Sequence, residues 1–159
     1  MKTIFALSKK NNKQTNTFTQ EKKNTMATTN FKGNKVNLDG TFIATGTIAP
    51  QVELVKNDLS TCTLDEHKGK YVILNIFPSI DTGVCAASVR KFNKLAASTP
   101  NTVVLCISRD LPFAQSRFCG AEGIENVVTL SDFRRESTFG KDYGVQMADG
   151  PLTGLLARA

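Results

Sequence analysis

Cys85 occupies a position at which a thiol can become reactive. It follows the apolar run 71–77 and the segment 78–84, Pro-Ser-Ile-Asp-Thr-Gly-Val, and it precedes a segment with a helical pattern. The start of a helix favours a thiolate, because unpaired N–H groups and the helix dipole stabilise negative charge there. Pro78 stops the strand, and Thr82 is suited to cap the helix. Although many cysteines merely pack in a core, this setting favours redox chemistry or nucleophilic attack at Cys85.

The other three cysteines have less distinctive surroundings. Cys106 lies within the apolar run 102–108, so we expect it to be a small core residue. Cys62, between two threonines, is expected to be partly exposed and without a role. Cys119 stands near the end of a predicted helix whose glycines make that end easy to unravel. From the residues alone, Cys119 is either a thiol that resolves an oxidised Cys85 or a bystander.

A metal site is not expected, and we predict no cofactor. None of the four cysteines forms a Cys-x-x-Cys pair. The single histidine, His67, has no partner at ligand spacing, and its charged neighbours indicate a solvated surface residue.

Strand and helix patterns alternate along the middle of the chain. We expect strands at 71–77, 102–108 and 127–130, and helices at 85–98, 112–121 and 136–143. A Gly-Asn turn predicts a small hairpin over 31–36, and the Gly- and Thr-rich stretch 41–54 is expected to be mainly loop. The alternation predicts an α/β fold with right-handed crossovers and a mainly parallel sheet.

The basic character of the chain is concentrated at its N-terminus. The formal charge is +6, of which residues 1–25 carry +5, so that residues 26–159 are close to neutral. The leader is rich in Asn, Gln, Thr and Lys, a composition typical of disorder. We therefore predict a disordered basic leader over 1–25 and one folded domain over 26–159.

Three interpretations of the leader remain: a disordered tail, a weak nucleic-acid or membrane arm, and sequence upstream of a true start at Met26. It lacks aromatic residues interleaved with its lysines, which argues against nucleic acid. No apolar run approaches the roughly 20 residues that span a bilayer. We therefore predict neither a nucleic-acid nor a membrane partner.

The residues around Cys85 resemble those of a known family. The run 75–90, Asn-Ile-Phe-Pro-Ser-Ile-Asp-Thr-Gly-Val-Cys-Ala-Ala-Ser-Val-Arg, is similar to bacterial thiol peroxidase, an atypical two-cysteine peroxiredoxin, as are the segments 103–108, 110–123 and 149–152. The resemblance implies a thioredoxin-like (peroxiredoxin) fold with an N-terminal β-hairpin. It also implies reduction of hydrogen peroxide and organic hydroperoxides, with thioredoxin as the reductant.

The resemblance also assigns roles to single residues. Cys85 matches the peroxidatic cysteine and Cys119 the resolving one, which together form an intramolecular disulfide. Pro78 and Thr82 complete the Pro-x-x-x-Thr-x-x-Cys motif, and Arg158 matches the active-site arginine. Family members are usually homodimers, and cysteines that must cycle favour a cytoplasmic location.

The resemblance assigns no catalytic role to the other two cysteines. Cys106 matches a cysteine that is not needed for turnover, and Cys62 matches none that we can place in the family.

The sequence departs from the family pattern after Arg158. In the family this arginine opens a strand, followed by a hairpin partner and a closing helix, whereas this sequence stops at Ala159. We expect the fold to lack these last two strands and the closing helix, with strand 71–77 at an exposed edge and Arg158 on a frayed terminus. Poor folding and low activity would follow. The alternative function is a non-catalytic truncated fragment that binds a redox partner without turnover.

Overall fold

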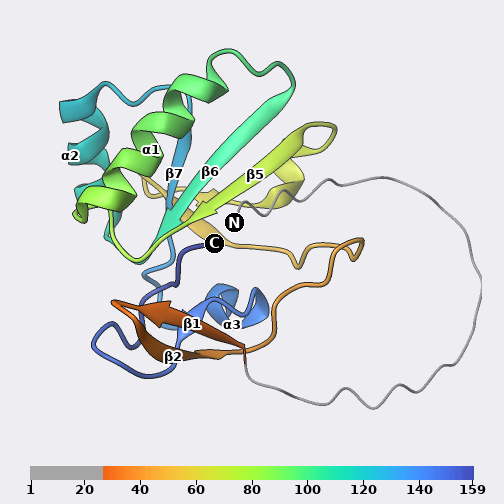
Figure 1. Cartoon of the computed structure of the whole chain (residues 1–159). Helices are drawn as coiled ribbons and strands as arrows, with labels where there is room; N and C mark the ends of the chain where they lie inside the picture. The colour runs from red at the N-terminus through yellow and green to blue at the C-terminus, as the bar shows by residue number, and fades with distance from the viewer. Residues whose placement is uncertain (1–26) are drawn as a thin grey trace, which may run out of the picture.

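The computed structural model describes residues 27–159, and our predictions for the leader lie outside them. The chain forms a smaller sheet with strand order β1-β2-β8 and a larger sheet with order β4-β3-β7-β6-β5 (Figure 1). The strands are β1 Thr28–Phe31, β2 Asn34–Asp39, β3 Leu54–Lys56, β4 Thr61–Cys62, β5 Tyr71–Ile76, β6 Thr102–Ser108, β7 Val128–Ser131 and β8 Gln146–Met147. The helices are η1 Leu64–His67 (a 3-10 turn), α1 Gly83–Ala96, α2 Pro112–Glu122 and α3 Phe139–Asp142.

The N-terminal hairpin is confirmed, with its turn one residue earlier than predicted. β1 and β2 pair so that Phe31 faces Asn34, which leaves Lys32 and Gly33 as the two turn residues. Both have positive φ, 48° and 83°, as a tight two-residue hairpin turn requires. Gly33 therefore provides the second turn position, and Asn34 already belongs to β2.

The larger sheet is mixed rather than mainly parallel: β5, β6 and β7 run parallel as predicted, whereas β3 pairs antiparallel with both β4 and β7. β5 pairs with β6 from Tyr71↔Thr102 to Ile76↔Ile107, and β6 pairs with β7 in the same direction. β6 is apolar on both faces because both are covered: Leu105 and Ile107 belong to one core cluster, and Val104 and Cys106 to another. Helices α1 and α2 lie on the second of these faces (Figure 1).

Local signals set the ends of both helices on that face. Thr82 caps α1 by accepting the Cys85 N–H, so α1 begins at Gly83, two residues before the predicted start. Pro112 opens α2, and Gly123 ends it in the left-handed conformation with φ 62°. No helix among residues 27–159 is long and apolar enough to cross a membrane.

The predicted partial exposure of Cys62 is wrong. Its side chain is fully buried and belongs to the core cluster that contains Leu54 and Val72. Cys62 faces Leu54 across the β3–β4 pair, and this tertiary pairing, which a two-residue strand does not reveal, directs the side chain inward. His67 is half-buried rather than solvated, with Nε2 3.6 Å from the Cys62 Sγ atom.

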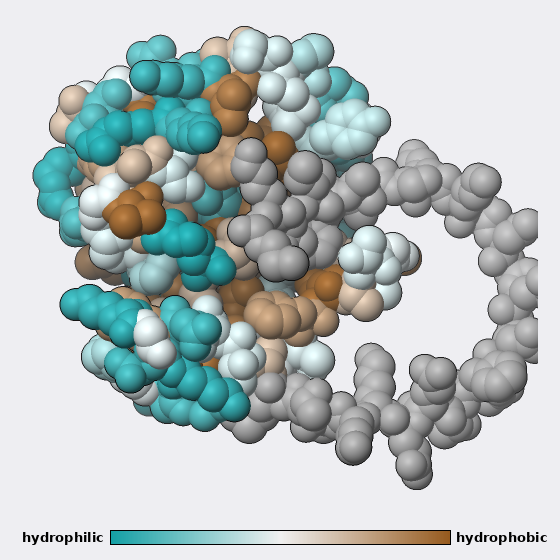
Figure 2. All heavy atoms as spheres, viewed as in Figure 1, coloured by the Kyte–Doolittle hydropathy of each residue, from teal (hydrophilic) through white to brown (hydrophobic). Residues whose placement is uncertain are grey.

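The face of the molecule seen in Figure 2 carries both hydrophilic and apolar residues. Figure 2 shows hydrophilic residues over α1 and over the β1–β2 hairpin, with scattered apolar residues between them. β5 lies at one end of the strand order of the larger sheet, as we expected for the strand 71–77.

Gly144 provides a test of the packing between α3 and the loop after β2. It has φ 65°, and a Cβ atom built on it would lie 2.4 Å from the Thr41 carbonyl carbon. A left-handed backbone alone costs an alanine roughly 1–2 kcal/mol. We expect Gly144→Ala to lower the free energy of unfolding by clearly more than that, measured by urea denaturation.

Gly46→Ala is the matched control. Gly46 has φ 84°, and a Cβ atom built on it would have nothing within 4 Å, so its substitution adds strain without a clash. Equal losses of stability in the two variants would contradict the role of the Gly144 contact.

Candidate active site

The predicted site residues lie near the carboxyl ends of the parallel strands in the larger sheet. Because the carboxyl ends of β5 and β6 meet at one edge of this sheet, the loop 77–82 after β5 lies beside the chain that leaves β6. The Phe77 N–H donates to the Ile107 carbonyl, 3.0 Å away, which continues the pairing into this loop. The loop then leads directly into α1.

Cys85 is buried in the first turn of α1. Its N–H donates to the Thr82 hydroxyl oxygen at 3.3 Å, and the Arg158 Nη2 atom donates to its Sγ atom, also at 3.3 Å. An arginine stays protonated under all ordinary conditions, so its N–H groups bring a positive charge to the Cys85 sulfur. Three of the predicted residues are therefore joined by hydrogen bonds.

The position of Arg158 corrects our expectation of a frayed terminus. The backbones of Ala159 and Ile76 exchange two hydrogen bonds, at 3.0 and 3.1 Å. The Ala157 N–H donates to the Val145 carbonyl at 2.7 Å. Arg158 lies between these two anchored residues, so its backbone is fixed and its side chain reaches Cys85.

Arg109 anchors the chain that precedes Arg158, and sequence reasoning missed it. Its guanidinium donates to the Asp132 carboxylate at 3.0 Å, to the Gln146 side-chain oxygen at 2.9 Å and to the Gly154 carbonyl. Burial raises the pKa of the Asp132 carboxyl, even though Ser137 and Arg109 hydrogen-bond to it. The arginine immediately after a buried strand was the signal available in the sequence.

Pro78 and Cys119 are not among the residues hydrogen-bonded to Cys85 in the described part of the chain. Pro78 is half-buried at the start of the loop, directly after the fully buried Phe77. Cys119, on α2, is partly buried and packs against the cluster that contains Cys85. Its Sγ atom lies 3.6 Å from the Thr129 hydroxyl oxygen, and all four cysteines carry free thiols.

Cys106 is confirmed as a core residue. Burial raises the pKa of its thiol to about 12, although the Asn75 amide donates to the sulfur at 3.5 Å. The same Asn75 accepts a hydrogen bond from Ser88, one turn after Cys85 on α1. Cys106 therefore remains a protonated thiol near neutral pH, and its neighbour Asn75 fixes α1 on the sheet.

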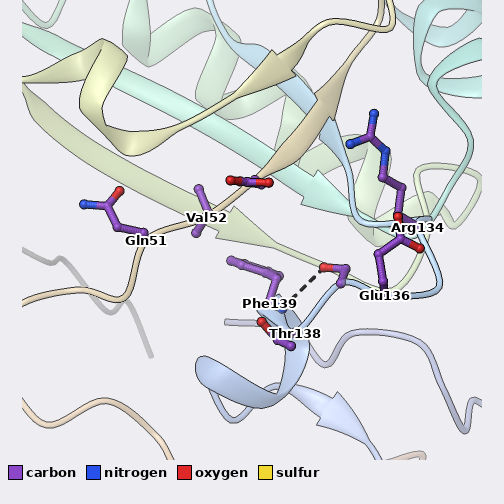
Figure 3. Close-up of a pocket in the computed structure, with 8 residues that line it drawn as sticks. Gln51, Val52, Arg134, Glu136, Thr138 and Phe139 are labelled. Atoms are coloured by element: carbon purple, nitrogen blue, oxygen red, sulfur yellow. Dashed lines mark hydrogen bonds between the residues drawn. The ribbon is translucent and has the colours of Figure 1, made fainter.

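A separate pocket of about 300 Å³ opens between the segment before β3 and the loop after β7. Figure 3 shows side chains of both segments around it, with Arg134 and Glu136 on the side of the second loop. The pocket is lined by Gln51, Val52, Glu53, Arg134, Glu136, Ser137, Thr138 and Phe139. None of the predicted site residues lines it, so it is not the site around Cys85.

Replacement of Arg158 by methionine tests its contact with Cys85. A hydrogen bond to a charged group contributes about 1.5–3 kcal/mol, so its loss should slow alkylation of Cys85 by iodoacetamide at pH 7 by roughly tenfold or more. The modified Cys85 peptide is quantified by mass spectrometry.

The control for this experiment is Arg117→Met, because Arg117 is an exposed arginine on α2. Its removal should leave the alkylation rate of Cys85 unchanged. Wild-type rates in the Arg158→Met variant would show that the contact does not act on the sulfur.

Comparison with known proteins agrees with this geometry. Residues 44–159 match the Redoxin family. The chain is 55% identical over 134 residues to thiol peroxidases of Mycobacterium bovis and Mycobacterium tuberculosis, an alignment that covers 84% of this chain and 79% of each relative.

Solved structures give the same result. A peroxiredoxin-like protein from Aquifex aeolicus is 39% identical, with a TM-score of 0.75 over 84% of this chain and 77% of its own. A thiol peroxidase from Chromobacterium violaceum, 23% identical, shares the fold with a TM-score of 0.73 over 81% of this chain and 75% of its own. The chain thus belongs to the redoxin family, within which it is a peroxidase of the bacterial thiol peroxidase group.

Proposed function

We propose that this chain reduces hydrogen peroxide and organic hydroperoxides through a two-cysteine cycle, with thioredoxin as the reductant. The observation that carries the proposal is the 3.3 Å contact from Arg158 to the Cys85 sulfur at the capped start of α1. A positive group and a helix start act together on one thiol, which is the arrangement that nucleophilic cysteines need.

In the first step the Cys85 thiolate attacks one oxygen of the peroxide. The S–O bond forms as the O–O bond breaks, the attacked oxygen keeps its hydrogen to give a sulfenic acid, and the other oxygen leaves as hydroxide or alkoxide and takes a proton from solvent to become water or an alcohol. Arg158 stabilises the negative charge on the leaving oxygen. The Thr82 oxygen accepts the Cys85 N–H, so its own proton remains available to the peroxide. Pro78 limits the access of water to the sulfur.

In the second step the Cys119 thiolate attacks the oxidised sulfur of Cys85. An S–S bond forms, the hydroxyl group leaves as water, and the resulting disulfide is reduced by exchange with thioredoxin. A disulfide requires Cα atoms about 4.4–6.8 Å apart, so this step needs the segment of Cys119 to adjust wherever its distance from Cys85 exceeds that range.

The end of α2 is suited to this adjustment. The Cys119 carbonyl accepts the N–H groups of both Gly123 and Ile124, the last contacts of the helix. An exposed ion pair between Arg90 and Glu122 joins the same helix end to α1. Glu122 and Gly123 are exposed at this helix end, so we propose that the turn that holds Cys119 opens locally during the cycle.

The other thiols have no part in this cycle. Burial raises the pKa of Cys62 and raises that of Cys106 to about 12, so neither supplies a thiolate near neutral pH. We further propose a cytoplasmic homodimer, on the basis of the family resemblance and of cysteines that must be reduced after each turnover.

The non-catalytic alternative depended on poor folding without the last strands and helix, and also on a loose Arg158. Its hydrogen bond to Cys85 and the pairing of Ala159 with Ile76 favour the catalytic assignment instead. The expectation of weakened folding and low activity stays a prediction.

Single cysteine substitutions test the cycle. Cys85→Ser should abolish peroxide consumption, whereas Cys119→Ser should consume about one equivalent and stop at a sulfenic acid that reacts with dimedone. Cys106→Ser is the control and should turn over normally with thioredoxin and its reductase, followed by NADPH oxidation. Full turnover by Cys85→Ser would reject the assignment of the peroxidatic cysteine, and full turnover by Cys119→Ser would reject that of the resolving one.

A further inference from the structure

The loop between β5 and α1 needs support from outside itself. It carries Thr82, which caps α1 and holds the Cys85 N–H, yet Asp81 and Thr82 are both exposed. Within the loop, the Thr82 N–H donates to the Ser79 carbonyl at 3.2 Å. A shift of Ser79 or of its neighbour Ile80 would therefore pass directly to the cap of α1.

The carboxylate of Asp110 supplies this support. One of its oxygens accepts a hydrogen bond from the Ser79 hydroxyl at 2.8 Å, and the other accepts the Ile80 N–H at 2.6 Å. Asp110 lies on the chain that leaves β6, thirty residues away in the sequence. Both oxygens of a charged group thus face two consecutive residues of the loop, and hydrogen bonds to an ionised group are the strong ones.

Asp110 is itself held by buried neighbours. The Ser108 hydroxyl donates to its carboxylate at 2.7 Å, and the Ser131 hydroxyl donates to its carbonyl. Gln115, fully buried in the first part of α2, donates to the Ser108 hydroxyl at 3.0 Å and to the Leu130 carbonyl at 2.9 Å. The ends of β6 and β7 and the start of α2 therefore fix the position of the carboxylate.

We propose that Asp110 is a positioning residue for peroxide reduction. It does not contact the substrate; it acts through Ser79 and Ile80 on Thr82 and on the Cys85 N–H. The start of α2, held through Gln115, stays in place while the other end of the helix releases Cys119. This inference rests on the proposed role of Cys85 as the reacting thiol.

An amide at this position cannot replace the carboxylate. Oδ2 accepts hydrogen bonds from the Ile80 N–H and the Ser108 hydroxyl, and Oδ1 accepts one from Ser79. Asparagine has one acceptor oxygen and no negative charge. Its NH₂ group must therefore either face a hydrogen-bond donor or make the Ser79 hydroxyl accept a hydrogen bond instead of donating one. Asp110→Asn therefore keeps the size of the side chain and disturbs the loop.

The test measures two reactions of the same sulfur in the full chain. Oxidation of Cys85 by hydrogen peroxide needs the positioned loop, whereas alkylation by iodoacetamide needs only an accessible thiolate. In Asp110→Asn we expect the rate of Cys85 oxidation to fall between about tenfold and a hundredfold, because small displacements of reacting groups slow reactions by such factors. The rate of Cys85 alkylation should change far less. Reduction of the preformed disulfide by dithiothreitol should be unchanged.

Asp149→Asn is the matched control. The Asp149 carboxylate accepts the Asn37 backbone N–H at 2.9 Å and its amide at 2.6 Å, in the smaller sheet. This variant loses a comparable set of hydrogen bonds without touching the loop, so its ratio of oxidation to alkylation should equal that of the wild type. Ser79→Ala, which removes one of the three hydrogen bonds to the Asp110 carboxylate, should show a smaller loss than Asp110→Asn.

The outcomes separate this inference from the proposed function. A wild-type ratio of oxidation to alkylation in Asp110→Asn would overturn the positioning role and leave the role of Cys85 intact. An equal fall of this ratio in Asp149→Asn would also overturn it, because the effect would then be one of general stability. Peroxide consumption that persists in Cys85→Ser would instead reject the proposed function itself.

Discussion

The parallel pairing of β5, β6 and β7 is the constraint on which the rest of the structure depends. Parallel strands end at the same edge of a sheet, so the segments that leave them are brought together however far apart they are in the sequence. The segments that leave β5, β6 and β7 contribute Thr82, Asp110 and Asp132 to this edge, and Asp132 anchors the guanidinium of Arg109. Cys85 lies at this edge because α1 starts there.

The carboxyl ends of these strands alone do not provide a positive charge beside the Cys85 sulfur. That charge is supplied by Arg158, whose backbone is held between Val145 and Ile76 by hydrogen bonds of its two neighbours. A charged side chain stabilises charge on a buried sulfur best if folding already fixes its position, because no side-chain entropy is then lost during the reaction. The two sheets of the chain are thus linked by the segment that contributes the arginine.

Much of this arrangement could be predicted from the sequence. The run 102–108 matched β6, and the signals of Thr82 and Pro112 located the starts of both helices, because these features depend on residues close together in the chain. Cys106 was recognised as a core residue for the same reason.

Features that depend on distant residues were missed. The burial of Cys62 follows from its pairing with Leu54, and the fixed position of Arg158 from the pairing of Ala159 with Ile76. The three partners of Arg109 and the contacts of Asp110 with the loop likewise join segments 23 to 45 residues apart. Local patterns do not encode such contacts, and even the family resemblance assigned a role to Arg158 without indicating what holds it.

The most direct test of this account is peptide mass mapping of the reduced chain at intervals after one equivalent of hydrogen peroxide. The account predicts a Cys85–Cys119 disulfide within seconds, with Cys62 and Cys106 still recovered as thiols. Slow oxidation scattered over all four cysteines would contradict it, because the fold would then not single out Cys85.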